Sequence, residues 1–369
     1  MINIVVTGAG GFLGKNLCVA FERMEEVSLK RIFSSTPDKK ILDYIVDADY
    51  IYHLAGVNRP TDVKEFEKGN VDFTLKILNA CLHCTTPPTI VFTSSIQAEL
   101  DNAYGRSKLD AEKLLADYSN RLIINSVIYR LPGVFGKWSR PNYNSVVSTF
   151  CYKVANSKDI QISDPNLMLK LVYVDDVINS FVGQLDQRNS GVTFKEVIPE
   201  YNITLGELGA AIKSFPSIRK SLQTPDMSND LDKRLYSTYL TYLNKQDFAY
   251  DLALKKDERG DLFEWIKSSS FGQVFVSTTK PGVTRGNHFH HLKTEKFLVI
   301  RGEAEIKFRS VLSEEIVVYA VSGDYPRVVD IPPGYTHSIT NTGRNELITL
   351  FWANEIFDSS KPDTYFLNV

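Results

Sequence analysis

The hydrophobic residues of the first half of the chain form short apolar runs separated by helical patterns. The first run, Ile2–Val6, has the apolar character of a buried strand and is followed by an amphipathic pattern through Leu17 and Phe21. Four similar runs follow it along the chain, namely Ser28–Phe33, Tyr50–Leu54, Thr89–Thr93 and Ile123–Tyr129. Because strand and helix patterns alternate, the sequence predicts a doubly wound parallel sheet of the Rossmann type.

The pattern changes near residue 252. A helix is expected to start within Tyr201–Leu208, and Asp232–Ser237 belongs to the last segment before the change. Beyond it, short alternating strands and Gly/Pro turns predict an all-β jelly-roll barrel. We therefore expect two domains, an α/β domain at residues 1–245 and a barrel domain at residues 252–369, which suits a chain of 369 residues.

A glycine-rich turn joins the first predicted strand to the first predicted helix. Gly8, Gly11 and Gly14 have G-x-x-G-x-x-G spacing. In this context backbone N–H groups and the helix N-terminus can face a pyrophosphate, and the missing side chains permit its approach. The sequence thus predicts a dinucleotide cofactor contacted by Thr7, Gly8, Gly10, Gly11, Phe12, Leu13 and Gly14.

Tyr104 and Lys108 lie on a predicted helix that follows Ser94 and Ser95 at the end of a predicted strand. Residues four apart share a helix face, so Lys108 can hold a cofactor ribose and lower the pKa of Tyr104. The phenol can then exchange a proton with a carbonyl oxygen as hydride moves. A strand-end serine completes the donor set, and the spacing leaves open whether it is Ser94 or Ser95.

These residues, together with several accompanying motifs, resemble the extended short-chain dehydrogenase/reductase family over about residues 1–243. The accompanying motifs are His53–Gly56, Asn70, Arg130–Gly136 and Tyr173–Val177. The resemblance implies a substrate of the nucleotide-sugar class and packing of Leu54, Ala55 and Gly56 on the cofactor. One departure is that the insertion usual between the serine and the tyrosine is short here.

The end of the second predicted strand bears on the choice of cofactor. NAD enzymes generally place Asp or Glu there to bind the ribose 2′-OH, and such a carboxylate would repel a 2′-phosphate. Here the strand ends in hydroxyl residues, among them Ser34 and Ser35, and Lys39 and Lys40 lie nearby. The sequence favours NADP(H), with Ser34 and Lys39 as its contacts.

Four ligand-type residues stand in the last third of the chain: His288, His290, Glu295 and His337. Residues two apart on a strand share a face, so His288 and His290 both enter the barrel, and Glu295 and His337 can approach from neighbouring strands. Three imidazoles and one carboxylate suit a divalent metal, zinc first, and would also suit iron, manganese or nickel. By the same alternation, His291 is expected to point outward and be exposed.

The spacing of these residues and their flanking glycines resembles the cupin pattern, from about residue 252 to the end. Segments upstream of the histidines resemble 3,5-epimerases and 3,4-ketoisomerases of dTDP-4-keto sugars, which implies that His288 is a base removing a proton beside a ketone. The metal and base interpretations compete for His288, and the metal is favoured because Glu295 and His337 are both present. Arg259 and Glu264 are candidate substrate contacts, with a structural salt bridge as the equal alternative.

Taken whole, the chain resembles a family of bacterial capsular polysaccharide enzymes in which a reductase is fused to a cupin. The segments that carry this resemblance are Gly56–Pro60, Ser94–Ala98, Lys137–Ser145, Leu235–Leu240 and Pro362–Leu367. It implies C3 epimerisation of a UDP-2-acetamido-2,6-dideoxy-4-hexulose, then NADPH-dependent C4 reduction to the L-talose sugar, on the path to UDP-N-acetyl-L-fucosamine. Asn142 and Asn144 are further candidate substrate contacts.

Two alternatives stay open. The cupin can have lost catalysis and serve only to form a homodimer beneath a working reductase, because fold alone does not establish chemistry. The substrate can instead be a dTDP-4-keto-6-deoxyhexose, since no motif reads the base or the acetamido group.

Composition limits the other possibilities. The formal net charge of −2 and the pI near 6.3 give no electrostatic footprint for nucleic acid or an anionic membrane. No run of 18 apolar residues occurs, and Met1 leads directly into a predicted strand, so we expect a cytoplasmic protein. The four cysteines are expected to be reduced, including the Cys81–Cys84 pair at a helix end.

Overall fold

A computed structural model of the chain describes residues 1–122, 125–187, 191–252, 255–257, 260–262, 266, 272–355 and 358–369. The chain divides into two compact units. The first contains Met1–Ser145 and Leu169–Ile203, and the second contains Val146–Met168 and Thr204–Val369.

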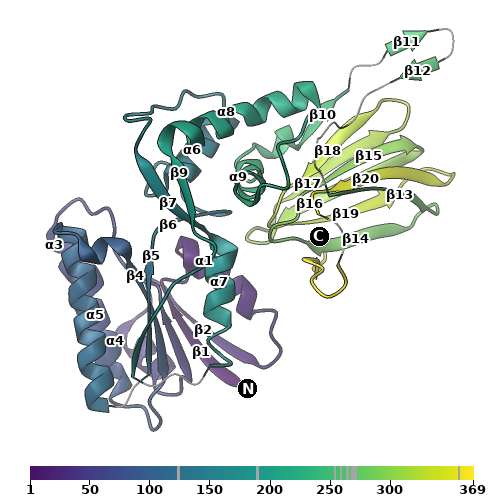
Figure 1. Cartoon of the computed structure of the whole chain (residues 1–369). Helices are drawn as coiled ribbons and strands as arrows, with labels where there is room; N and C mark the ends of the chain where they lie inside the picture. The colour runs from purple at the N-terminus through teal and green to yellow at the C-terminus, as the bar shows by residue number, and fades with distance from the viewer. Residues whose placement is uncertain are drawn as a thin grey trace. The chain divides into compact units, whose positions relative to one another are not determined.

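The first unit is built on a six-stranded parallel sheet (Figure 1). Its strands, in spatial order, are β2 (Val27–Ile32), β1 (Ile2–Thr7), β3 (Tyr50–His53), β4 (Thr89–Ser95), β5 (Ser126–Leu131) and β8 (Val192–Lys195). The chain leaves β1 for β2 on one side and returns to β3 on the other, so the strand order reverses between β1 and β3. The carboxyl ends of strands at such a switch point form the usual binding crevice of open α/β sheets.

Helices cover both faces of this sheet (Figure 1). α1 (Phe12–Phe21) and α7 (Val174–Val182) pack on one face. α2 (Asp38–Ile45), α4 (Phe73–Cys81) and α5 (Ala103–Leu122) pack on the other. The remaining elements are α3 (Lys64–Phe66), the π-helix η1 (Glu67–Asp72), the 3₁₀-helix η2 (Ile96–Glu99), and a separate small sheet of β6 (Gly133–Phe135), β7 (Met168–Tyr173) and β9 (Tyr201–Thr204).

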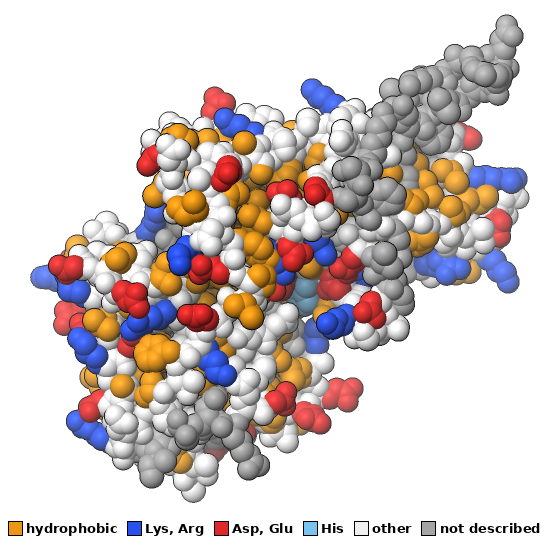
Figure 2. Space-filling view, in the orientation of Figure 1, with side chains coloured by type: hydrophobic (Ala, Val, Ile, Leu, Met, Phe, Trp, Pro, Cys, Tyr) orange, Lys and Arg blue, Asp and Glu red, His pale blue; other side chains and the backbone are white. Residues whose placement is uncertain are grey.

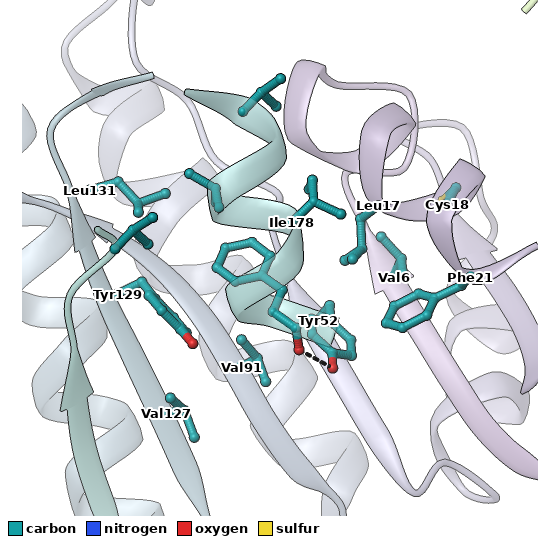
Figure 3. Packing of buried hydrophobic residues seen from close by; sticks show 14 of the residues in the cluster. Val6, Leu17, Cys18, Phe21, Tyr52, Val91, Val127, Tyr129, Leu131 and Ile178 are labelled. Atoms are coloured by element: carbon teal, nitrogen blue, oxygen red, sulfur yellow. Dashed lines mark hydrogen bonds between the residues drawn. The ribbon is translucent and has the colours of Figure 1, made fainter. Parts of the chain in front are cut away.

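Strand alternation divides the apolar side chains between the two faces. Ile4 and Val6 of β1 belong to the core under α1 and α7, whereas Val5 belongs to the core under the other helices. Figure 3 shows the first of these cores, in which the Tyr52 hydroxyl donates to the carbonyl of Phe181 at 2.8 Å. Burying an aliphatic side chain contributes about 1.5–3 kcal/mol, so these two layers hold the sheet and its crevice rigid.

The second unit contains two five-stranded antiparallel sheets, which Figure 1 shows as the strand-rich part of the chain. The first sheet consists of β10 (Ala249–Asp251), β18 (Arg327–Ile331), β15 (Glu295–Arg301), β20 (Leu347–Ala353) and β13 (Gln273–Thr279). The second consists of β17 (Ile316–Ser322), β16 (Glu303–Ser310), β19 (Tyr335–Asn341), β14 (Thr284–Phe289) and β21 (Tyr365–Phe366). A separate hairpin pairs β11 (Lys255–Asp257) with β12 (Gly260–Leu262). The expected fold class, a parallel α/β sheet followed by an all-β barrel, is confirmed.

Helices α6 (Val146–Ala155), α8 (Leu205–Ser221) and α9 (Asp230–Leu240) complete the second unit, together with the 3₁₀-helix η3 (Lys245–Phe248). The predicted helix start is confirmed: the Thr204 side chain accepts from the backbone N–H of Glu207, and the Glu207 carboxylate accepts from the N–H of Thr204, which is a capping box. Arg219 of α8 bonds to the buried Asp330 carboxylate of β18, tying this helix to the barrel.

In the described part of the chain, no helix is both long and apolar enough to span a membrane. Lysine and arginine side chains are interspersed with aspartate and glutamate on the face that Figure 2 presents. That face therefore has no large patch of one charge, in agreement with the near-neutral net charge.

Candidate functional site

The glycine-rich turn lies at the carboxyl end of β1, against the end of β3. Gly8 has a φ of +66°, and a Cβ added to it would lie 2.8 Å from the Cα of Ala55, so only glycine fits here. The backbone N–H of Ala55 donates to Thr7 Oγ1 at 3.2 Å, which joins the two strand ends. Gly8, Leu54, Ala55 and Gly56 are thus brought together, as the sequence suggested.

The N-terminus of α1 is open to an anion. Gly10 and Gly11 are exposed, and Gly11, Phe12, Leu13 and Gly14 form the first turn. Within the described residues, no side chain caps this helix and no acidic residue stands in its first turn. The free N–H groups and the positive end of the helix dipole suit the pyrophosphate of a dinucleotide.

His53 organises the space beneath the turn. Its Nδ1 lies 2.7 Å from Thr7 Oγ1, and its Nε2 lies 2.9 Å from Thr74 Oγ1. The Thr74 hydroxyl donates to the carbonyl of Asn70, so it accepts from Nε2–H, and Nδ1 accepts from Thr7. Burial, with a smaller effect from Lys108, lowers the pKa of His53 to about 3, so the ring is neutral and serves to hold the strand ends.

Asn70 on the π-helix η1 links the loop that follows β3 to α5. Its side chain accepts from the N–H of Val57 at 2.7 Å and donates to the Val57 carbonyl and to Ser107 Oγ, both at 2.9 Å. A Cβ on Gly56 would lie 3.0 Å from Asn70 Oδ1 and 3.3 Å from Lys108 Nζ. The loop and Lys108 therefore border the same space.

Tyr104 stands on α5 beside the end of β4. Burial raises its pKa, while a hydrogen bond with Ser95 lowers it in part. The expectation that Lys108 lowers the pKa of Tyr104 is therefore not met, because burial has the larger effect. Ser95 therefore faces the phenol, whereas Ser94 donates to the Glu112 carboxylate. Lys108 donates to the carbonyl of Thr93 at 2.7 Å, and burial lowers its pKa to about 8, opposed by the charge of Glu112. The geometry thus separates two serines that the sequence could not.

The ion pair of Glu112 with Arg130 was missed by the sequence analysis, which named Arg130 only as part of a family motif. Glu112 is 4% exposed, and Arg130 contacts both of its carboxylate oxygens, with Nε 3.0 Å from Oε1 and Nη2 2.7 Å from Oε2. The spacing Tyr104, Lys108, Glu112 would have indicated one face of a helix. Glu112 also accepts a hydrogen bond from Ser94, and its charge raises the pKa of Lys108. The ion pair therefore stabilises the residues beside Tyr104.

A cavity of about 490 Å³ lies beside the end of β2, lined by residues that include Phe33, Arg31, Ser35 and Lys40. Phe33 lies next to the glycine turn, 3.4 Å from where a Cβ on Gly10 would stand. Ser34 and Lys39, the expected contacts, are exposed and do not line this cavity. Arg31 forms an ion pair with Glu22, and the other cationic side chains that line the cavity are Lys30 and Lys40. Lys40 is our candidate for a phosphate contact.

The other candidate substrate contacts are two exposed asparagines and two residues that the structure does not describe. Asn142 and Asn144 are exposed in a turn that follows β6. Arg259 and Glu264 lie outside the residues that the structure describes.

The second candidate centre lies inside the barrel. Ligand atoms of His288, His290, Glu295 and His337 all lie within 4.8 Å of one another. His288 of β14 is directly opposite His337 of β19, and His290 follows the end of β14 by one residue. Glu295 is the first residue of β15, and β15 belongs to the other five-stranded sheet and does not pair with β14. The expectation that Glu295 approaches from a strand neighbouring those of the histidines is therefore wrong. The four side chains meet between the two sheets.

The buried nitrogen atoms of this cluster fit a metal ion. Nε2 of His290 and Nε2 of His337 lie 3.4 and 3.5 Å from Glu295 Oε2, yet neither forms a well-aligned hydrogen bond with a described atom. Both rings have their Nδ1 directed at a backbone carbonyl, that of Asp363 at 2.5 Å and that of Tyr335 at 3.3 Å. In the neutral form of each ring, Nδ1 therefore carries the proton and Nε2 is the unprotonated nitrogen, which is the form in which a histidine binds a metal.

The charged groups of the cluster shift its pKa values in different directions. Burial would lower the pKa of His290, but the Glu295 carboxylate raises it above its ordinary value. Burial lowers the pKa of His288 to about 4, and His337 and His290 lower it further. Burial would raise the pKa of Glu295, but the two neighbouring imidazoles hold it well below its usual range. An ionised carboxylate among imidazoles is an N₃O donor set that suits zinc and related divalent ions.

His291, expected to be exposed, is half-buried. The strand ends at Phe289, so alternation no longer applies, and the His291 ring packs against Tyr365 at a centroid distance of 5.0 Å.

Comparison with known proteins follows the same two-part division. Residues 4–203 match the NAD dependent epimerase/dehydratase family, and residues 255–365 match the polysaccharide biosynthesis C-terminal domain. A curated relative from Pseudomonas aeruginosa, UDP-2-acetamido-2,6-beta-L-arabino-hexul-4-ose reductase, is 41% identical over 368 residues, covering 100% of this chain and 99% of the relative.

Solved structures agree. The capsular polysaccharide assembling protein CapF from Staphylococcus aureus is 45% identical, with a TM-score of 0.68 over 100% of both chains. UDP-glucuronic acid 4-epimerase from Bacillus cereus, 20% identical, shares the fold over 58% of this chain and 84% of its own, with a TM-score of 0.51. The end-to-end resemblance suggested by the sequence is confirmed.

Proposed function

Because the chain belongs to the NAD dependent epimerase/dehydratase family, we propose that it is a bifunctional nucleotide-sugar enzyme that uses NADPH. The barrel inverts C3 of a UDP-2-acetamido-2,6-dideoxy-4-hexulose, and the N-terminal half reduces the C4 ketone to UDP-2-acetamido-2,6-dideoxy-L-talose. This product leads toward UDP-N-acetyl-L-fucosamine and capsular polysaccharide. The full-length similarity to a hexul-4-ose reductase supports the choice of substrate.

The observation that carries the proposal is the presence of two chemically different constellations on one chain. Tyr104, Ser95 and Lys108 suit proton and hydride chemistry at a carbonyl. The histidine–glutamate cluster lies in the other compact unit and suits a metal-assisted proton transfer. We assign reduction to residues 1–245 and epimerisation to residues 252–369.

In the reductase half, Tyr104 donates a proton to the C4 oxygen. Its raised pKa keeps the phenol protonated near neutral pH, and Ser95 orients it. Ser94 supports α5 through Glu112, and Lys108 holds the nicotinamide ribose. NADPH, when bound on the turn Gly8–Gly14, supplies the hydride.

In the barrel, His290, Glu295 and His337 hold a divalent metal, for which zinc is the first choice, with His288 as a fourth ligand. A metal bound there supplies Lewis acidity toward a ketone oxygen. His288 is the least buried of the four, so it is the member that a substrate can reach, and its second candidate role is to accept the C3 proton.

The order of the two steps follows from carbonyl chemistry. The C3 proton is acidic only while C4 is a ketone, because the carbanion is stabilised by delocalisation onto that oxygen. Reduction removes this stabilisation, so epimerisation comes first. Removal of the ketone by reduction then draws a near-balanced epimerisation forward.

The alternative is a dTDP-4-keto-6-deoxysugar reductase whose barrel only forms a dimer. A dimer through the barrel is also part of our proposal, because the edge strand β13 exposes Val274, Phe275 and Val276. Dimerisation is therefore shared by both functions and does not separate them. Hydrogen exchange at C3 does separate them, because a purely structural barrel leaves that hydrogen in place.

We expect NADPH to be preferred over NADH by on the order of a hundredfold in kcat/KM, as one charge-assisted phosphate clamp commonly gives. Lys40→Met should reduce this preference about tenfold by weakening NADPH use alone, since Lys40 lines the cavity beside the glycine turn. Lys39→Met, which removes the adjacent exposed lysine, is the matched control. Equal kcat/KM for the two cofactors in the wild-type protein would refute the assignment.

The substrate is tested by mass spectrometry and NMR of the products formed from a panel of UDP- and dTDP-4-keto sugars. We expect turnover of the UDP-2-acetamido sugar with inversion at C3. Faster turnover of a dTDP-4-keto-6-deoxyhexose without inversion would favour the alternative.

A further inference from the structure

We infer that the C-terminal segment Pro362–Val369, with Asp363 as its principal residue, is a positioning element of the histidine–glutamate centre. The inference rests on the proposed metal site and adds the residues that hold its ligands in place. Asp363 contacts no candidate ligand through its carboxylate, and acts through the backbone next to them.

The Asp363 carboxylate fixes the turn that joins the two sheets. It accepts from three consecutive backbone N–H groups, those of His291 at 2.9 Å, Leu292 at 2.9 Å and Lys293 at 2.6 Å. This turn connects His290 to Glu295, so its conformation decides how ligands from the two sheets meet. An ionised carboxylate can accept all three bonds on its two oxygens, whereas an amide offers one acceptor oxygen.

The backbone of the same residue sets the proton on His290. The carbonyl oxygen of Asp363 lies 2.5 Å from His290 Nδ1 and can only accept, so Nδ1 carries the proton and Nε2 is left toward Glu295. Asp363 has a φ of +35°, a conformation that Asp and Asn tolerate better than most residues. One residue therefore holds both the turn and the tautomer.

The rest of the segment holds the other two histidines. The N–H of Leu367 donates to the carbonyl of Asn287 at 2.8 Å, directly before His288, and β21 pairs with β14 at His288. Thr336, directly before His337, donates its hydroxyl proton to the carbonyl of Leu367. His290 is therefore bonded directly to this segment, and His288 and His337 each follow a residue that is bonded to it.

The point before His288 needs such support because the strand is irregular there. The β14–β19 register shifts between Gly286 and His288, and Asn287 has a φ of +56°. A Cβ on Gly286, whose φ is +100°, would lie 2.8 Å from the carbonyl oxygen of His337. A bulge of this kind re-aims the next side chain, and the bond from Leu367 fixes it in that form.

The test uses the full-length protein and Zn²⁺ alone as the probe. We expect Asp363→Asn to weaken Zn²⁺ affinity about 10- to 100-fold in competition with a chromophoric chelator, as loss of an outer-shell partner commonly does. Asp358→Asn is the matched control, because the Asp358 carboxylate accepts from Ser360 in the same region of the chain. Its affinity should stay within about twofold of wild type.

A second readout separates positioning from a general loss of stability. Long-range ¹H–¹⁵N NMR of the metal-free protein reports the proton on each imidazole, with the His290 signal identified by its loss in His290→Gln. We expect Nδ1–H for His290 in the wild type. Asp363→Asn keeps the carbonyl that faces Nδ1 but loses carboxylate bonds to the turn after His290, so the ring should no longer be held against that carbonyl and a mixture of tautomers is expected. If Asp363→Asn does not fold, Thr336→Val removes the bond to Leu367 and should weaken Zn²⁺ binding severalfold.

The outcomes are distinguishable. Wild-type protein that binds no Zn²⁺ overturns both the metal proposal and this inference. Wild-type protein that binds Zn²⁺, with a folded Asp363→Asn variant of equal affinity and unchanged tautomer, overturns the inference alone.

Discussion

Replacement of Tyr104 by phenylalanine is expected to lower NADPH-dependent reduction of the 4-keto sugar by about 10²–10⁴-fold, the usual contribution of a positioned general acid. The change removes the phenolic proton and its hydrogen bond with Ser95 but keeps the ring that packs on Phe66. The fold and the cofactor turn should therefore be unaffected. The loss should appear in kcat measured by the decrease of NADPH absorbance.

Tyr118→Phe is the matched control. Tyr118 lies on the same helix, and its hydroxyl bonds to Asn79 away from the cofactor turn. It should reduce the ketone at nearly the wild-type rate. Equal rates for Tyr104→Phe and Tyr118→Phe would show that another group protonates C4.

Replacement of His290 by alanine is expected to remove bound metal and to slow hydrogen exchange at C3 by on the order of 10² or more, since Lewis-acid stabilisation contributes several kcal/mol. The variant keeps Glu295 buried with one imidazole partner fewer, so the centre loses a ligand and charge balance together. Elemental analysis and deuterium incorporation measure the two effects.

Two controls accompany this variant. His291→Ala removes the adjacent histidine, which lies outside the ligand cluster, and should retain metal. A C3-epimerised ketone supplied to His290→Ala should still be reduced, because the tyrosine site is in the other compact unit. Full exchange activity in metal-free His290→Ala would contradict the proposed metal role.

The sequence predicted the fold class because its signals are local. The buried strand at Ile2–Val6 and the helix start within Tyr201–Leu208 depend on neighbouring residues, and both predictions are confirmed in the structure. Tyr104 with Lys108, and His288 with His290, were predicted to lie together for the same reason, since short spacings on a helix or a strand fix which side chains share a face. His337 is distant in sequence and was included because of the resemblance to the cupin pattern.

What the sequence could not predict depends on contacts between distant segments. Ser94 donates to the Glu112 carboxylate, whereas Ser95 forms a hydrogen bond with Tyr104. The sequence did not indicate that Glu112 would be the partner of one of the two serines. Asp363 bonds to a turn about seventy residues earlier, and no spacing rule connects them. His291 was wrongly expected to be exposed because β14 ends before it, which alternation alone does not reveal.

The most direct test of two separate sites is hydrogen exchange by the Tyr104→Phe variant. The variant is incubated in deuterated water, without NADPH, with the UDP-2-acetamido-2,6-dideoxy-4-hexulose, and the sugar is analysed by mass spectrometry and NMR. We predict deuterium at C3 at a rate close to that of the wild type, with no reduced product. Loss of exchange in a Tyr104→Phe protein that remains folded and metal-bound would place both steps in one shared site and contradict the proposal.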